Sequence, residues 1–421
     1  MARTRFYLPH NPEYSIVDSL HDSVRFARKC LVNYNDHLAQ NATFVNADGT
    51  PMLWHDFGVL EGPGWASNAI GGARNLYFYG RIMGQPEVSR DGLCVLDHVL
   101  EDHFIDWETG FIKGYRHIPT DRRCLNYKSN DDWFCVGSMA RMAYQLLSFA
   151  SELATDTRAP RMRQAAVSCG QWIAQHLQMA PNGWVPRRST PDGTPYRLNP
   201  EGSDDILFDC SADGIFLLDL WGALTQIGMA DYHDRLRDLA TCFADSGGFF
   251  GSINHDTYDA HECVAYACTF RTFRRLAGVL GDDHLRQFAY DVALKGLSLF
   301  RMSDDRNRVS TKGLLWMERT WDTAYLWENA EASMAYLEAY QDTGSKRYLA
   351  YALTILRAIA KHHHGPYGFL TEGVDWNNHV GAQHHFDYAT YGDIQYTEPL
   401  LNNLHHAEPV LHYLSACLAS V

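Results

Sequence analysis

Apolar residues recur along most of the chain with the spacing of amphipathic helices, and few segments alternate as β-strands do. In the segment 158–179, Ala165, Cys169, Trp172 and Ile173 fall on one side, with arginines and glutamines opposite. The same periodicity predicts twelve helices, at 15–39, 65–83, 86–103, 132–154, 158–179, 208–227, 230–245, 258–280, 283–301, 321–343, 345–363 and 395–420.

The predicted helices alternate between two kinds. Helices 158–179 and 283–301 each carry one polar face, whereas 258–280 and 321–343 begin with apolar residues on nearly every side. A helix that is apolar all round must be covered on all sides. The alternation therefore predicts two concentric rings, with an outer ring that faces solvent and an inner ring packed within it.

The connections follow the same alternation. Short links such as Met83–Pro86 and Leu280–Asp283 lead from each inner helix to the next outer one, and they carry the glycines and polar residues that end and begin helices. Long segments rich in glycine, aromatic and acidic residues lead back. The sequence therefore predicts an all-α (α/α)6 toroid of six helical hairpins, formed by residues 1–421 as a single catalytic domain with its long loops at one end. An open solenoid of the same hairpins is the alternative.

Composition and charge restrict the partners. The net charge of -14 argues against a nucleic-acid partner, because no basic run is present to neutralise a phosphate backbone. No run approaches the roughly 18 apolar residues of a membrane span, and we expect no secretory signal. The ten cysteines show no C-x-x-C spacing, so we expect reduced thiols in a cytoplasmic protein. No cofactor is expected.

Nearly every long loop pairs a tryptophan or phenylalanine with a carboxylate. The richest is Gly247–Glu262, which runs into a helix through two histidines and three acids. Aromatic residues make up 13% of the chain and either fill a core or stack on sugars. Beside carboxylates that accept hydrogen bonds from hydroxyl groups, they predict a carbohydrate site. The predicted substrate-binding residues are Trp54, His55, Arg116, Trp133, Arg188, His255, Tyr258, Trp316, Arg319, Trp376, His384, His385 and Tyr391.

Carboxylates near the starts of the inner helices are the candidates for acid–base catalysis. Glu262 and Asp322 are preferred, with Asp132, Asp256 and Glu328 as substitutes. Asp132 and Asp322 could instead cap helices. Glu262 and Glu328 fall in helices that are predicted to be buried on all sides, where an unpaired carboxylate has a high free-energy cost.

The histidines suggest weaker sites. Three consecutive histidines, His362–His364, suggest a metal site, but such residues at a helix end usually contact the C-terminal carbonyl groups, and no metal is predicted. His405 and His406 are expected to be structural.

Three stretches, Gly64–Ala69, Ser252–Glu262 and Trp321–Glu331, resemble the α/α-toroid carbohydrate-active enzymes. They are similar to unsaturated glucuronyl hydrolases and to the β-glucuronidases of glycoside hydrolase family 154. The resemblance implies a toroid over nearly the whole chain and activity on uronic-acid sugars. Hydrolases, lyases and epimerases share this fold, so the resemblance transfers no catalytic pair.

The leading functional hypothesis is hydrolysis of a glucuronide, expected to be β-linked, or of another uronic-acid oligosaccharide by two carboxyl groups. An arginine fork would hold the sugar carboxylate, from Arg116, Arg187, Arg188 or Arg319. A polysaccharide lyase would instead use His255, His384, His385, Tyr258 or Tyr391. A sugar epimerase or isomerase and a non-catalytic carbohydrate-binding toroid are further alternatives.

Overall fold

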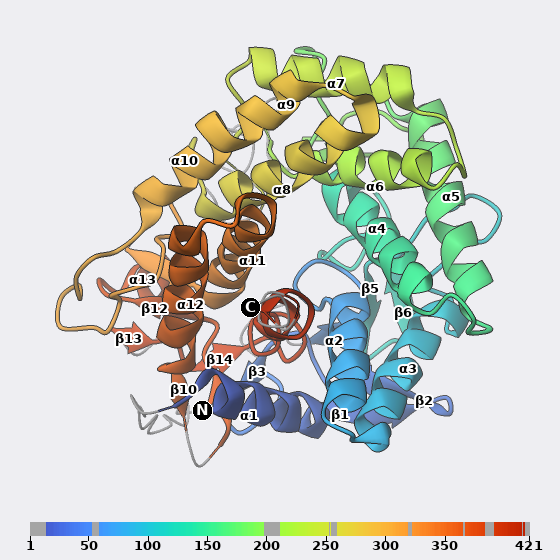
Figure 1. Ribbon diagram of the computed structural model, residues 1–421. Helices are drawn as coiled ribbons and strands as arrows, with labels where there is room; N and C mark the ends of the chain where they lie inside the picture. The colour runs from blue at the N-terminus through green and yellow to red at the C-terminus, as the bar shows by residue number, and fades with distance from the viewer. Residues whose placement is uncertain are drawn as a thin grey trace. The chain divides into compact units, whose positions relative to one another are not determined.

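A computed structural model describes residues 14–52, 59–197, 211–251, 253, 259–318, 322–364, 367–383, 391–414 and 416 (Figure 1). The chain forms two compact units. Unit 1 comprises Met1–Glu61, Ala66–Val95 and Leu297–Val421, and unit 2 comprises Gly62–Trp65 and Leu96–Gly296.

Most of the longer helices begin and end within a few residues of the predicted positions. They are α1 (Ile16–Lys29), α2 (Ala69–Ile82), α3 (Pro86–Glu101), α4 (Val136–Glu152), α5 (Ala159–His176), α6 (Ile215–Gln226), α7 (His233–Asp245), α8 (Cys263–Leu280), α9 (Asp283–Phe288), the π-helical η3 (Ala289–Leu294), α10 (Lys295–Leu297), the 3-10 turn η4 (Ser298–Phe300), α11 (Leu326–Thr343), α12 (Lys346–Ala360), α13 (His379–Gln383) and the π-helical η5 (Pro409–Leu414).

Unit 2 is built from two layers of helices. Helices α4, α6 and α8 pack side by side in one layer, and α5, α7 and α9 cover them in the other (Figure 1). The inner layer is buried on nearly all sides, as in α6, where almost every residue from Ile215 to Thr225 is buried. The outer layer exposes one face to solvent, as in α7, where only Leu236, Leu239, Ala240 and Phe243 are buried. The predicted alternation of fully buried helices and helices with one solvent-exposed face is thus present within this unit.

Small residues let the two layers of unit 2 approach closely. Gly170 of α5 lies against α6, where an added Cβ would come within 2.8 Å of the Leu224 side chain. The Trp221 indole N–H donates to the Gly170 carbonyl at 3.0 Å. A larger residue at 170 would therefore require the Leu224 side chain to move.

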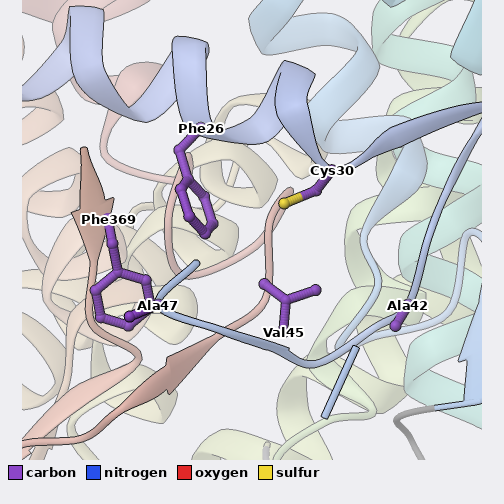
Figure 2. Close-up of a cluster of buried hydrophobic side chains, with 6 residues drawn as sticks. All are labelled: Phe26, Cys30, Ala42, Val45, Ala47 and Phe369. Carbon is purple, nitrogen blue, oxygen red and sulfur yellow. The ribbon is translucent and has the colours of Figure 1, made fainter. Parts of the chain in front are cut away.

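Unit 1 joins the two ends of the chain. Helix α11 packs against α12 and η5, while α1 packs against α12 and the strand β11 (Phe369–Leu370). Figure 2 shows part of the resulting core, in which Phe26 of α1 and Cys30, directly after α1, face Val45 and Phe369. The rings of Phe26 and Phe369 meet edge to face at 5.6 Å.

The strands are only two to four residues long. They are β1 (Leu31–Tyr34), β2 (His37–Gln40), β3 (Val45–Asn46), β4 (Leu60–Glu61), β5 (Tyr115–His117), β6 (Arg122–Cys124), β7 (Phe134–Cys135), β8 (Arg188–Ser189), β9 (Thr323–Tyr325), β10 (His363–His364), β11, β12 (Gly373–Asp375), β13 (Gly392–Asp393) and β14 (Tyr396–Thr397). In unit 1, β9, β12 and β13 form one sheet, and β14 pairs with β3. In unit 2, β7 pairs with β8. These pairs fix the loops that lead into α4 and α11.

Two predicted helices are wrong in part. The helix expected at 15–39 ends at Lys29, and the hairpin β1–β2 follows. Its turn residues Asn35 and Asp36 both have positive φ, as two-residue hairpin turns require. In the segment 395–420, where one helix is expected, the chain first forms β14 and then a series of turns up to His406.

Two further expectations from the sequence concern membrane-spanning helices and the state of the cysteine thiols. Over the part of the chain that the structure describes, no helix combines the length and apolar character needed to cross a membrane. The cysteines in that part are free thiols.

Candidate functional site

The starts of α4, α6 and α8 lie together in unit 2. The Ala212 amide donates to the Gly251 carbonyl at 3.0 Å, and the Glu262 amide donates to the Phe250 carbonyl at 2.8 Å. A Cβ on Gly137, in the first turn of α4, would come within 2.2 Å of the Asp213 carbonyl oxygen. Three loops that are far apart in sequence therefore converge on the start of this helix layer.

Asp213 is the acid at this junction, directly before α6. It is 4% exposed, and the Ser211 hydroxyl donates to its Oδ1. Burial raises the pKa of Asp213 to about 6, although the hydrogen bond from Ser211 and the charges of Arg187 and Arg188 lower it. A carboxyl group whose pKa is raised in this way can act as a general acid.

Sequence reasoning did not single out Asp213 as a site residue. An aspartate just before an apolar helix has the pattern of a helix cap, and the signal that distinguishes it is burial, which periodicity does not give.

Glu262 closes the loop in front of α8. Its side chain is fully buried, and Oε2 accepts a hydrogen bond from the Ile253 amide at 2.7 Å. This hydrogen bond ties Ile253, in the middle of the Gly247–Glu262 loop, to the start of α8. Glu262 and Asp213 lie in neighbouring helix starts, which the hydrogen bond between Ala212 and Gly251 joins.

Trp133 and Arg188 come together through the pairing of β7 with β8. The Arg188 guanidinium lies 5.3 Å from the centre of the Trp133 ring, and Tyr196 stacks on that ring at 6.0 Å. Trp133 is 1% exposed. In this arrangement it packs within the protein, and its ring is covered by protein groups.

Two further predicted residues of unit 2 are held elsewhere. Asp132 is exposed, and its amide donates to Asn130 Oδ1 at 3.1 Å. Arg116 is buried and pairs with Asp121 of the β5–β6 hairpin at 3.2 Å.

In unit 1, the structure brings the predicted residues Asp322 and Trp376 together. Asp322 Oδ1 accepts from the Trp376 indole N–H at 3.0 Å, and Oδ2 accepts from Asn377 Nδ2 at 2.9 Å. Because β9 pairs with β12, the two residues lie at the same edge although 54 positions separate them. Asp322 is thus fixed by neutral donors on both oxygens.

Trp316 and Tyr391 lie in the same unit. The Arg306 guanidinium lies 5.3 Å from the centre of the half-buried Trp316 ring. The Tyr391 ring is exposed, and its hydroxyl donates to the Asn307 carbonyl.

A buried acidic network surrounds the start of α11. Glu328 is fully buried in the first turn, and Glu331 follows one turn later. Glu331 Oε1 lies 3.0 Å from His405 Nε2. Asn402 links the network, since it donates to Glu398 at 2.6 Å and accepts from the Trp327 amide at 2.9 Å. Glu331 and His405 thus form a buried pair of a carboxyl group and an imidazole ring.

The three consecutive histidines lie at β10 and just before it. His362 Nδ1 is 2.8 Å from Asp393 Oδ1, and His364 Nε2 is 2.5 Å from Asp393 Oδ2. His363 Nε2 lies 3.2 Å from the Ser23 hydroxyl. Among the contacts in the described part of the chain, these histidines bind a carboxylate and a hydroxyl group.

At the level of sequence, no family model and no curated protein matches the chain. Solved structures match it in fold. A cellobiose 2-epimerase from Bacillus thermoamylovorans is 13% identical, with 95% of this chain and 99% of that chain covered at a TM-score of 0.62. An α-mannanase of glycoside hydrolase family 76 from Bacteroides thetaiotaomicron is 11% identical, with 97% and 100% covered at 0.60. An unsaturated glucuronyl hydrolase from Bacillus sp. GL1 is 14% identical, with 96% and 97% covered at 0.51.

The chain has the (α/α)6-toroid fold of these carbohydrate-active enzymes. The predicted fold class is confirmed. Identities of 11–14% transfer the fold and no residue roles. The specific resemblance to the family 154 β-glucuronidases stays a prediction.

Eight predicted site residues lie outside the described residues, namely Trp54, His55, His255, Asp256, Tyr258, Arg319, His384 and His385. Their roles also stay predictions.

Proposed function

We propose that this toroid is a glycoside hydrolase that cleaves a glucuronide or another uronic-acid oligosaccharide. The observation that carries the proposal is the buried Asp213 carboxyl group, with its pKa of about 6, at the shared start of three helices. In two-carboxyl hydrolysis, one protonated group donates to the leaving oxygen, and the other activates water or attacks the sugar. The raised pKa of Asp213 supports its assignment as the acid. Glu262, on the neighbouring helix start, is the proposed second group.

Two buried arginines support a uronate as the sugar. Arg187 and Arg188 are 2% and 0% exposed and are near enough to Asp213 to lower its pKa. A guanidinium group binds a carboxylate through two parallel hydrogen bonds. In a chain with a net charge of -14, this local positive charge would favour an anionic sugar at this point.

The test compares aryl β-glucuronides that carry good and poor leaving groups. The parent protein should hydrolyse both, and should act weakly on the matching glucosides. Asp213→Asn should lower turnover of the poor leaving group by about 100-fold or more and that of the good leaving group far less, because only the former needs a proton. Glu262→Gln should lower both. Equal rates for Asp213→Asn and the parent on both substrates would remove the assignment.

A second candidate is a sugar epimerase or isomerase, which the Glu331–His405 pair and the matched cellobiose 2-epimerase favour. A histidine paired with a carboxylate can remove a proton beside a sugar carbonyl and return it. Cellobiose and mannose in D₂O should then lose the C2 proton signal, and His405→Asn should prevent the loss. Glucuronide hydrolysis without such exchange would eliminate this candidate.

The lyase alternative depends mostly on histidines outside the described residues. Formation of an unsaturated uronate, followed by its ultraviolet absorbance, distinguishes it from hydrolysis.

A further inference from the structure

Helix α12 of unit 1 carries a charge pattern that differs from that of the whole chain. The chain has a net charge of -14, yet no aspartate or glutamate occurs between Asp342 and Glu372. The lysines and arginines of this acid-free segment lie in α12 or directly after it, and they are Lys346, Arg347, Arg357 and Lys361. The segment is therefore a local region of positive charge on an acidic protein.

Most of these basic residues share the solvent-facing side of α12. The buried side is formed by residues at helical spacing, namely Ala352, Ile355, Leu356 and Ile359. The opposite side has the same spacing and consists of exposed or half-buried residues, namely Arg347, Ala350, Thr354, Arg357 and Lys361. We call its three basic residues, Arg347, Arg357 and Lys361, the α12 stripe. From the first to the last, the stripe extends over about 21 Å of helix rise.

The charges of the α12 stripe are not neutralised within the described part of the chain. Exposed arginines elsewhere pair with acids, as Arg122 does with Asp131 at 3.1 Å and Arg161 with Glu101 at 3.0 Å. Among the described residues, by contrast, no carboxylate forms an ion pair with a residue of the stripe. These positive charges are therefore available to a partner outside the chain.

Tyr351 joins a further cation to one end of the stripe. Arg347 Nε donates to the Tyr351 hydroxyl at 2.6 Å, and the guanidinium carbon of Arg301 lies 3.5 Å from the centre of the same ring. Burial raises the pKa of Tyr351, but the hydrogen bond from Arg347 and the charge of Arg301 outweigh burial and hold that pKa below its ordinary value. Two guanidinium groups thus act on one half-buried phenol.

The length and charge of the stripe indicate what kind of anion fits it. Guanidinium groups bind carboxylates through paired hydrogen bonds. A single sugar cannot reach along a stripe of about 21 Å, whereas a polysaccharide chain can. DNA, with about one charge per 1.7 Å, would be repelled by the acidic remainder of the protein more strongly than a polyuronate, which has one carboxylate per sugar.

We infer that the α12 stripe binds polysaccharide chains rich in uronic acids. Arg347, Arg357 and Lys361 contact carboxylates along the chain, and Arg301 extends the surface at the Arg347 end. The choice of a uronate rests on the proposed function, because such a surface would hold a hydrolase of uronic-acid sugars at its polymeric substrate. The proposed catalytic groups belong to unit 2, so the stripe takes no part in bond cleavage.

The test measures binding of the full chain to polygalacturonate by calorimetry at several salt concentrations, with the fully methyl-esterified polymer as the neutral comparison. The parent should bind the acid form, less tightly as salt rises, and should not bind the ester. A triple variant, Arg347→Gln with Arg357→Gln and Lys361→Gln, should bind the acid form about tenfold more weakly, because three exposed charge contacts are lost. Its turnover of an aryl glucuronide should equal that of the parent.

A second triple variant, Arg122→Gln with Arg161→Gln and Arg237→Gln, is the matched control. It removes the same charge from exposed arginines that pair with acids, so its affinity for polygalacturonate should equal that of the parent. Equal losses in the two triple variants, equal binding of the acid and ester forms, or tighter binding to double-stranded DNA than to polygalacturonate would each overturn the proposal. Binding of the polymer and turnover of the aryl glucuronide are separate measurements, so this proposal and that of the hydrolase can fail separately.

Discussion

Asp213 is held in an environment that favours its neutral form. Its pKa is about 6 in the folded protein, against an ordinary value of 3.8, so the folded state binds the proton more tightly than the unfolded state. The free energy of unfolding is therefore not reduced by Asp213 below about pH 4, and it falls as the pH rises through about 6 and the carboxyl group ionises. A rise of about two pKa units at 1.36 kcal/mol each gives a cost of roughly 3 kcal/mol at neutral pH.

Asp213→Asn should remove that cost at neutral pH. We expect the variant to be more stable than the parent by roughly 1–3 kcal/mol at pH 7 and to show no gain at pH 4, as measured by urea unfolding. Asp132→Asn is the control, because that side chain is exposed and should change stability little at either pH. A loss of stability at pH 7 in Asp213→Asn would mean that the charged form is structurally required.

Asp393 shows the opposite case. Burial opposes its charge, but His362 and His364 together outweigh burial and hold the pKa of Asp393 well below its ordinary value. Its contribution to stability is therefore present above about pH 4 and is lost as the pH falls further. Asp393→Asn should cost about 3 kcal/mol at pH 7, because it leaves two buried histidines without their acid.

Urea unfolding of this variant at pH 7 measures the cost. Asp304→Asn, an exposed position of the same unit, is the control and should lose almost nothing. If Asp393→Asn loses no more than the control, the histidines do not depend on the carboxylate.

At the scale of the helix, the close approach of α4 and α6 depends on Gly137. A Cβ there would lie 2.2 Å from a backbone oxygen of Asp213, whereas a Cβ on Gly278 of α8 would meet nothing within 4 Å. Gly137→Ala should therefore cost about 1–3 kcal/mol and lower turnover, because it displaces Asp213. Gly278→Ala should stabilise by about 0.5–1 kcal/mol. Thermal unfolding of the pair measures both, and stabilisation by both substitutions would show that the two helix starts are not tightly packed.

The elements that the sequence predicts well are those long enough to show a period. Helix α5 at Ala159–His176 falls within the expected 158–179, and α12 is found with similar accuracy. Strands β1 and β2 were missed, because four residues show little alternation and their turn depends on the positive φ of Asn35 and Asp36.

The site is less accessible from sequence, because its geometry depends on long-range pairing. Asp322 and Trp376 were both proposed, but their hydrogen bond requires β9 to pair with β12. The raised pKa of Asp213 requires burial where three helices begin. Neither condition is visible in the local pattern of residues.

For the whole molecule, the alternation of helices that are apolar all round with helices that have one polar face was enough to predict the toroid, which the matched structures confirm. The division into two units was not predicted. Each unit takes segments from more than one part of the chain, which passes between the units after residues 61, 65, 95 and 296. The third of these passages falls inside the continuous helix α3.

This connectivity predicts that the two units unfold together. A unit cannot unfold alone without breaking α3 and releasing three other chain crossings, so we expect one calorimetric transition whose measured enthalpy equals its van't Hoff enthalpy. Asp393→Asn changes unit 1 and Gly137→Ala changes unit 2, yet each should shift that same transition to lower temperature. Two resolved transitions, each moved by only one of the variants, would instead show that the units are separate folding domains. The toroid would then be an assembly of two such domains, and the expected single domain over residues 1–421 would be wrong.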